Sequence, residues 1–181
     1  ILVLLFLASL GLGAYASTFS NETLHYVITY KWGLVQKDAG EATLSLRTSG
    51  SNYVATLTAR TKPWADKLFQ VRDTLRAIMT VRELRPVRYE KIAHEGGKYS
   101  RDIITYSHSG GTARATANRT KVRDGKTKRS KKAFSTRYEA YDMLSIFYFV
   151  RSYDYSRLPK GRSIRRVIFS GSSAEFITIR N

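Results

Sequence analysis

The sequence predicts an all-β fold, an antiparallel meander that curves into a barrel or a half-barrel/sandwich with one buried helix near residues 142–153. Two features carry this prediction. From Thr23 onward, apolar and polar residues alternate over short runs, which is typical of strands with one buried face. Glycine-containing turns separate these runs at intervals of roughly ten residues, as in sandwiches and barrels.

The first three predicted strands lie at 24–31, 42–47 and 53–59. In each strand every second residue is apolar or aromatic, so one face should be buried and the other solvated. The segments 37–40 and 49–52 predict the two connecting turns, because Gly, Asp, Asn and Ser favour turn conformations. We therefore expect the three strands to pair in sequence order.

A proline and further alternating runs follow. Pro63 interrupts the pattern, and residues 64–69 predict one helical turn, because proline is tolerated near the start of a helix. Later strands are predicted at 69–81, 87–94, 99–107 and 112–122, with turns at 85–86, 95–97 and 109–111. A final hairpin is predicted from strands 162–169 and 174–180 about a turn at 170–172.

Residues 119–137 contain nine basic residues and a single acid, Asp124. One interpretation is a solvated hairpin end or a mobile loop. The other is a patch for polyanions, because clustered ammonium and guanidinium groups displace counterions from phosphates or uronates. In that case Lys126, Lys128 and Arg129 would attract the anion.

Residues 142–153 predict the one strong helix of the chain. Asp142 can cap its N-terminus by accepting hydrogen bonds from backbone N–H groups. Apolar side chains surround nearly the whole helix rather than forming one stripe. We therefore expect the helix to be buried on most sides, as in the mouth of a curved sheet.

The first residues, 1–16, predict a signal peptide, because they are uncharged, apolar and end on small residues at Ala14 and Ala16. A membrane anchor is the weaker alternative, since a bilayer-spanning helix needs about 20 apolar residues. Residues 17–181 would then form a single β-rich domain in the periplasm or at the outer-membrane periphery of a Gram-negative bacterium. The chain begins at Ile1 without a basic segment and stops within an alternating run, so we expect truncation at both ends, with C-terminal strands missing.

The net charge is +17, from 31 Lys and Arg against 14 Asp and Glu. This excess favours association with polyanions. After export these would be lipid A phosphates, anionic phospholipid head groups and acidic polysaccharides, and peripheral membrane contact fits the same charge. Nucleic acid would be the partner only in the cytoplasm. Cysteine is absent from the chain, so the fold must depend on its core and on sheet pairing.

The motifs that would indicate catalysis, a cofactor or a metal are missing from the sequence. The three histidines, His25, His94 and His108, lack metal-ligand spacing, and neither a G-x-S-x-G elbow nor a phosphate-binding loop occurs. A glycosidase needs two carboxylates that face one sugar. The carboxylate pairs that we considered for this role are Asp66 with Asp73 and Asp142 with Asp154. Surface acids are the better interpretation, so we predict a protein that is not an enzyme.

Five segments of the chain, 26–33, 38–42, 69–73, 84–89 and 141–148, resemble the domain-of-unknown-function family 3108. This family comprises exported proteins of Bacteroidota and other Gram-negative bacteria. The likeness extends from Thr23 to Arg180 in order and spacing. It implies an all-β envelope protein with an open or closed barrel and supplies no catalytic residue. A looser likeness is to periplasmic lipoprotein carriers, in which a half-barrel and a helical lid hold acyl chains.

We therefore predict a non-enzymatic periplasmic protein that binds an amphipathic or anionic envelope component, a lipid or a polysaccharide. Apolar contacts would come from Trp64, Phe69, Phe147 and Tyr148, and the cationic contacts from Lys126, Lys128 and Arg129. Two alternatives remain open. One is an assembly factor that binds other envelope proteins through a sheet edge, and the other is a glycan hydrolase with carboxylates that the sequence cannot pair.

Overall fold

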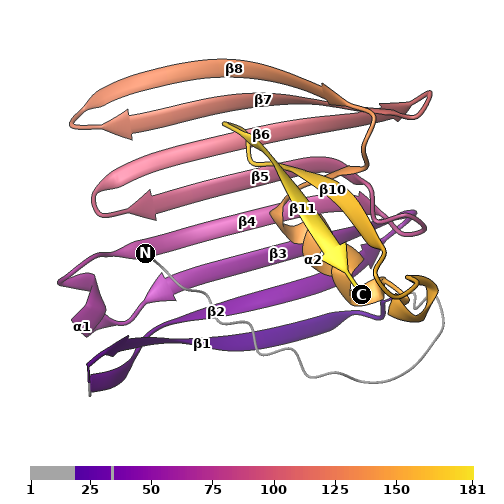
Figure 1. Cartoon of the computed structure of the whole chain (residues 1–181). Coiled ribbons are helices and arrows are strands. Elements are labelled where there is room, and N and C mark those ends of the chain that lie inside the picture. The colour runs from indigo at the N-terminus through magenta and orange to yellow at the C-terminus, as the bar shows by residue number, and fades with distance from the viewer. Residues whose placement is uncertain (1–18, 34) are drawn as a thin grey trace.

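A computed structural model describes residues 19–33 and 35–181, so the predicted signal peptide at 1–16 lies outside the described residues. The main element is an eight-stranded antiparallel sheet in which every strand pairs with the next in sequence (Figure 1). Its strands are β1 (Glu22–Trp32), β2 (Val35–Ser49), β3 (Asn52–Thr61), β4 (Val71–Thr80), β5 (Pro86–Glu95), β6 (Lys98–Ser109), β7 (Thr112–Arg123) and β8 (Lys126–Thr136). The predicted meander is confirmed.

The sheet curves but does not close. Strands β1 and β8 form its two edges and do not pair with each other within the described chain. Of the predicted alternatives, the closed barrel is therefore excluded, and the open sheet with its small second sheet is consistent with a half-barrel or a sandwich. Strand β8 carries five basic residues, and charged edge strands resist further strand pairing.

One predicted turn is wrong. Residues 37–40 do not connect two strands but lie inside β2, and the chain reverses next to Gly33, whose φ is 57°. The pairing shifts by one residue here, because Ile28 pairs with Gly40 whereas Thr29 pairs with Asp38. The extra residue, Ala39, makes a β-bulge. Polar and glycine-containing bulges resemble turns in sequence, which explains the error.

The basic segment is a hairpin and not a mobile loop. Asp124 and Gly125 have positive φ angles of 51° and 69° and connect β7 to β8. This geometry is that of a tight Asp-Gly hairpin turn. The prediction of a solvated hairpin end at this segment is therefore confirmed.

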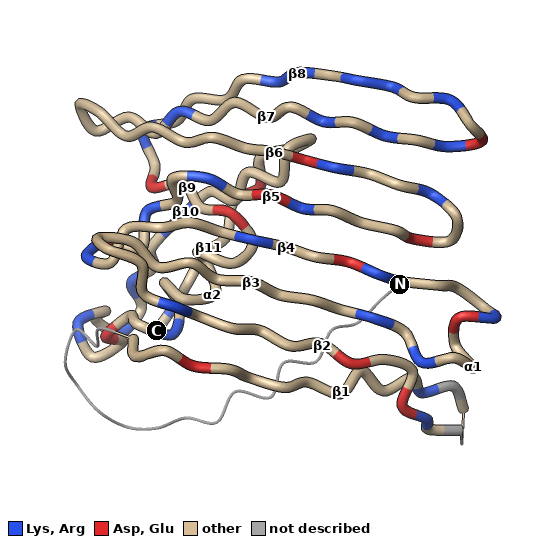
Figure 2. The backbone as a smooth tube through the Cα atoms, turned by 180° about the vertical axis from the view of Figure 1, so that it is seen from behind, with Lys and Arg blue, Asp and Glu red and all other residues tan. Residues whose placement is uncertain are grey.

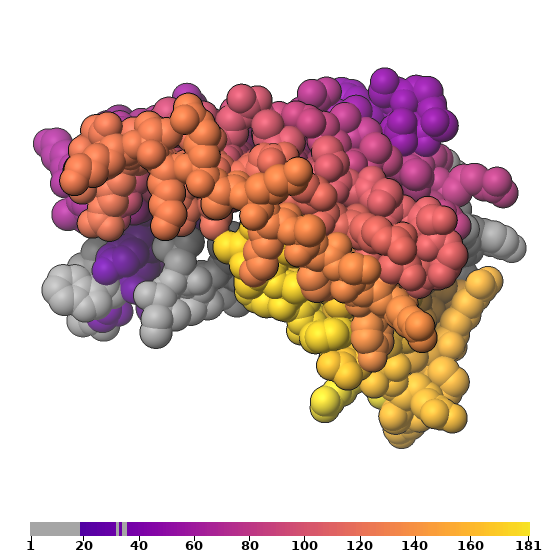
Figure 3. Space-filling view, turned by 90° about the horizontal axis from the view of Figure 1, so that it is seen from above, coloured from indigo at the N-terminus to yellow at the C-terminus, as the bar shows by residue number. Residues whose placement is uncertain are grey.

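A small second unit covers one part of the large sheet. It contains β9 (Ala140–Tyr141), α2 (Met143–Ser152), the 3-10 helix Tyr155–Arg157, β10 (Ser163–Phe169) and β11 (Ala174–Arg180). Strand β10 pairs with β11 in antiparallel and with β9 in parallel orientation. We call this unit the cap. Figures 1 and 3 show it projecting from one face of the large sheet, at one end of the strands.

The predicted helix is α2, and its N-terminus is built as expected. Asp142 accepts hydrogen bonds from the backbone N–H groups of Leu144 and Ser145, at 2.8 and 2.9 Å, and Ser145 Oγ accepts from the N–H of Asp142. The expected burial on most sides is only partly observed, because Met143 is 50% exposed and Phe149 is half-buried. The helix lies on the sheet with one side rather than filling a closed barrel.

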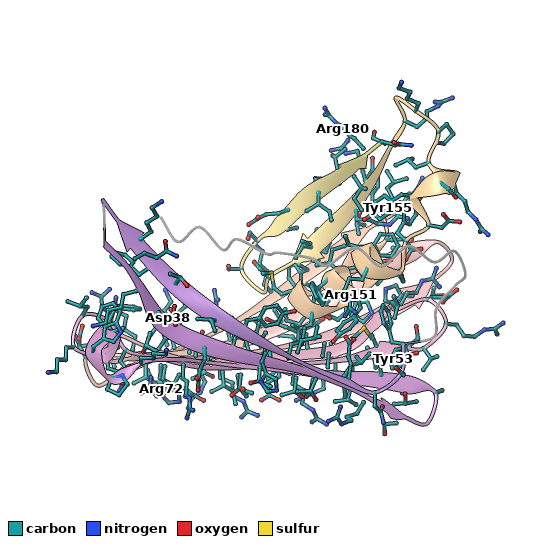
Figure 4. All side chains as sticks on the ribbon, turned by 90° about the horizontal axis from the view of Figure 1, so that it is seen from below. Asp38, Tyr53, Arg72, Arg151, Tyr155 and Arg180 are labelled. Atoms are coloured by element: carbon teal, nitrogen blue, oxygen red, sulfur yellow. The ribbon has the colours of Figure 1, made fainter. Side chains whose placement is uncertain are left out.

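The main core lies between the cap and the sheet. Leu46, Ala55, Ala77, Tyr89 and Ile104 contribute the sheet side and are at most 2% exposed. The cap side comprises Leu144, Tyr148 and Phe169. We call the sheet face that carries these core residues the inner face and the opposite one the outer face. Figure 4 shows Arg151 on the cap side of the sheet and Arg72 on the outer face.

Candidate functional site on the inner face of the sheet

At the margin of the cap, the inner face on β1 to β3 is apolar, and Leu24, Tyr26 and Leu57 pack against the main core there. Cross-strand pairing aligns its residues in rows, because directly opposed residues of antiparallel strands share a face. One row runs Leu24, Leu44, Leu57 and Leu75, and the next begins with Tyr26, Ala42 and Ala59. Leu24, Tyr26, Leu57, Ala59 and Leu75 are only half-buried. This area, with small side chains next to leucines, forms what we call the apolar floor.

The same rows become charged from β4 to β8. The floor's rows continue with Asp73, Lys91, Asp102 and Arg119. The Asp102 side chain is 3% exposed. It accepts hydrogen bonds from Nε and Nη2 of Arg119, at 2.5 and 2.7 Å. Lys91 Nζ lies 3.7 Å from Asp73 and 3.3 Å from Glu95. Near the floor, Arg119 is therefore paired with Asp102, and Lys91 is shared by two carboxylates.

Farther toward β8 the inner face has excess positive charge. Lys121 lies directly opposite Lys128, and Arg123 lies directly opposite Lys126. Among the described residues, Lys121, Lys126 and Lys128 take part in no ion pair, and Arg123 reaches only the exposed Asp124, at 3.4 Å. Like charges directly opposed on one face of a sheet are destabilising. We call these four cations the cationic pairs, and Figure 2 shows the Lys and Arg positions along both strands.

A carboxylate at the border between the two areas has an unusual proton affinity. Burial, and then the neighbouring carboxylate of Glu95, raise the pKa of Asp73 to about 6, although Lys91 acts in the opposite direction. Desolvation disfavours the charged form of an acid, and a nearby negative charge adds to that effect. Asp73 therefore changes its charge in a mildly acidic medium.

The structure separates the predicted site residues. Trp64 and Phe69 lie at the end of the sheet remote from the cap, in and after the short helix α1 (Pro63–Asp66). The indole N–H of Trp64 donates to the Asp38 carbonyl at 2.9 Å, and Lys37 Nζ lies 4.6 Å from the centroid of that ring. Trp64 is therefore held against the β1–β2 hairpin.

Phe147 and Tyr148 belong to the cap. Tyr148 is fully buried and packs edge-on against Phe19 and Phe147, with centroid distances of 5.1 and 5.2 Å. The Arg151 guanidinium lies 5.3 Å from the Phe147 ring and forms an ion pair with Glu22 of β1. These contacts attach α2 to the sheet edge and make Tyr148 a core residue.

The predicted cations divide between the two faces. Lys126 and Lys128 lie on the inner face, whereas Arg129 pairs with Thr120 on the outer face. The sequence interpretation did not single out Lys121 and Arg123. A signal for them was present, because an Asp-Gly turn sets the register of the two strands that it connects.

The outer face has a cavity of about 480 Å³, lined by residues of β2 to β5 such as Thr43, Thr58 and Thr74. The two arginines that line this cavity each form an ion pair with a nearby carboxylate. Arg60 pairs with Glu41, and Arg72 pairs with Asp66 at 2.6 Å. The inner face, where Lys121, Lys126 and Lys128 form no ion pair among the described residues, is the stronger candidate site.

The carboxylates that we considered for glycan hydrolysis hold structural contacts. Asp66 is bound by Arg72 and Asp73 lies near Lys91, while Asp142 caps α2 and Asp154 caps the 3-10 helix. Within the described ranges no group of three or more His, Asp or Glu side chains could hold a metal ion. The same ranges contain no helix whose length and apolar character would let it cross a bilayer.

The protein is an open antiparallel meander with a cap over one part of it. Its inner face carries both the apolar floor and the cationic pairs. The chain belongs to the family described as protein of unknown function (DUF3108), which matches residues 25–180. This confirms the family resemblance. No curated protein and no solved structure matches the chain.

Proposed function

We propose that the protein is an exported, non-enzymatic component of a Gram-negative envelope that binds an amphipathic anion on the inner face of its sheet. The acyl chain of the ligand would lie on the apolar floor, and its phosphate or carboxylate would contact the cationic pairs. Burial of apolar surface provides affinity, and the cations orient the anionic group.

One observation carries this proposal. Two directly opposed cationic pairs, Lys121–Lys128 and Arg123–Lys126, lie on the same sheet face as the half-buried floor. Their repulsion costs stability in the free protein, and a bound anion would relieve it. If the β8 lysines only protected the edge of the sheet, cations directly opposite them on β7 would not be needed.

The proposal is tested with lysophosphatidylglycerol below its micelle concentration, using the variant Lys121→Gln/Lys128→Gln. We expect binding at low salt to weaken by about 5-fold, since each exposed ion pair contributes about 0.2–1 kcal/mol. The midpoint of thermal unfolding should rise, because the like-charge pair is removed. Isothermal titration calorimetry and thermal unfolding provide the two readouts.

The matched control is Arg129→Gln/Lys131→Gln, which removes two charges from the outer face of β8. Its binding should stay within about twofold of the wild type, since screened surface charges act weakly at a distance. Equal losses in both variants would show that only net charge matters and would contradict the proposal. Glycerol phosphate, which has no acyl chain, should bind far more weakly than the lysolipid.

A further inference from the structure

The end of the sheet remote from the cap presents two adjacent apolar side chains to solvent. Leu68 is 77% exposed and Phe69 is 51% exposed. Both lie in the connection between α1 and β4, and the Phe69 ring lies at Gly96 of the β5–β6 turn. Figure 1 shows α1 at the end of the sheet remote from the cap. We call the connections at 62–70, 95–98 and 123–126 the open rim. Single exposed apolar residues are ordinary, but two adjacent ones at a projecting edge indicate a contact surface.

The rim holds these two side chains in place. The N–H groups of Leu68 and Phe69 both donate to the Ala65 carbonyl, at 2.9 Å. The Phe69 ring packs on Gly96 so closely that a Cβ at this glycine would lie 2.4 Å from the ring. Gly96 N–H in turn donates to the Gln70 carbonyl at 2.9 Å. The apolar pair is thus part of a braced turn.

The surroundings of the pair carry surplus positive charge. Each rim acid has a cationic partner: Asp66 pairs with Arg72, Glu95 with Lys91 and Asp124 with Arg123. Three rim lysines, Lys67, Lys98 and Lys126, are exposed and form no ion pair within the part of the chain that the structure describes. Apolar tips flanked by free lysines match the interface of an anionic bilayer, where apolar groups insert and lysines contact the head groups.

We propose that the open rim docks on the surface of an anionic lipid bilayer, with Leu68 and Phe69 inserted and the rim lysines on the head groups. Docking would bring the uncapped end of the inner face to a source of lipid. This biological role rests on the proposed function of the inner face. The docking itself depends only on the rim and can be measured separately.

The test is co-sedimentation of the purified protein with vesicles of equal parts phosphatidylglycerol and phosphatidylcholine. The variant Leu68→Ser/Phe69→Ser should bind about 10-fold more weakly, because insertion of both apolar side chains is lost. Lys67→Gln/Lys98→Gln should show a similar loss and a weaker dependence on salt. The wild type should bind pure phosphatidylcholine vesicles weakly.

Two control variants match these changes at the cap. Tyr138→Ser/Phe176→Ser removes an edge-on aromatic pair that is 43% and 52% exposed, and Lys160→Gln/Arg162→Gln removes two exposed cap charges. Both should bind vesicles like the wild type. The proposal would be overturned if the rim variants bound vesicles as strongly as the wild type. It would also be overturned if the control variants lost as much binding as the rim variants. Rim variants should still bind monomeric lysophosphatidylglycerol, so a failure of docking is distinguishable from a failure of the inner-face site.

Discussion

Replacement of Arg119 with methionine is expected to lower the free energy of unfolding by about 3–5 kcal/mol, because it leaves a buried carboxylate without its partner. Asp102 is 3% exposed and has a two-point hydrogen-bonded contact with Arg119. The β10–β11 turn lies over it, since a Cβ at Gly171 would lie 3.7 Å from the Asp102 carboxyl carbon. Water therefore cannot readily replace the guanidinium.

The measurement is urea unfolding of the wild type and the variant, followed by circular dichroism. Arg60→Met serves as the control, because Arg60 pairs with Glu41 at the surface with side chains 69% and 46% exposed. Loss of an exposed pair should cost less than about 1 kcal/mol. If Arg119→Met costs no more than Arg60→Met, the pair is not a structural element of the inner face.

The contribution of Asp142 to stability should fall as the pH rises from about 4 to about 6, so Asp142→Asn should gain stability relative to the wild type over this range. Burial raises the pKa of Asp142 to about 6, although the N–H groups of Ser145 and Leu144 act in the opposite direction. In this range the Asp142 carboxyl binds more protons in the folded state than in the unfolded state, so its contribution to the free energy of unfolding decreases with pH. A shift of about two units corresponds to about 3 kcal/mol.

Unfolding of the wild type and the variant at several pH values tests this expectation. Asparagine caps a helix about as well as aspartate, so the two proteins should have similar stability near pH 4 and the variant should be the more stable one above pH 6. Asp73, whose pKa is also raised to about 6, contributes to the same range, and Asp73→Asn measures its share. An unchanged pH dependence in Asp142→Asn would contradict the assignment.

Local patterns in the sequence determined the kinds of element in this protein. Alternation of apolar residues predicted the first seven strands of the meander but not β8, which lies in the basic segment. Asp142 followed by an apolar run predicted α2 with its N-cap. Pro63 predicted the short helix α1. These predictions succeeded because strand alternation and helix capping depend on residues that are close in the chain. Residues 37–40 were predicted wrongly, because a bulge has the composition of a turn.

The candidate site depends on contacts between residues that are far apart in the chain, which local sequence patterns do not reveal. Arg129 and Lys128 are neighbours in sequence but lie on opposite faces, and the significance of Lys128 depends on Lys121 across the strand. Arg151 meets Glu22 from a position 129 residues away, which places the cap over one part of the sheet and leaves the rest of the inner face open. The family, the β-rich class and the excess of cations could all be predicted from the amino-acid sequence. Strand register and cap position arise from long-range packing, and they determine which cations share the inner face with the apolar floor.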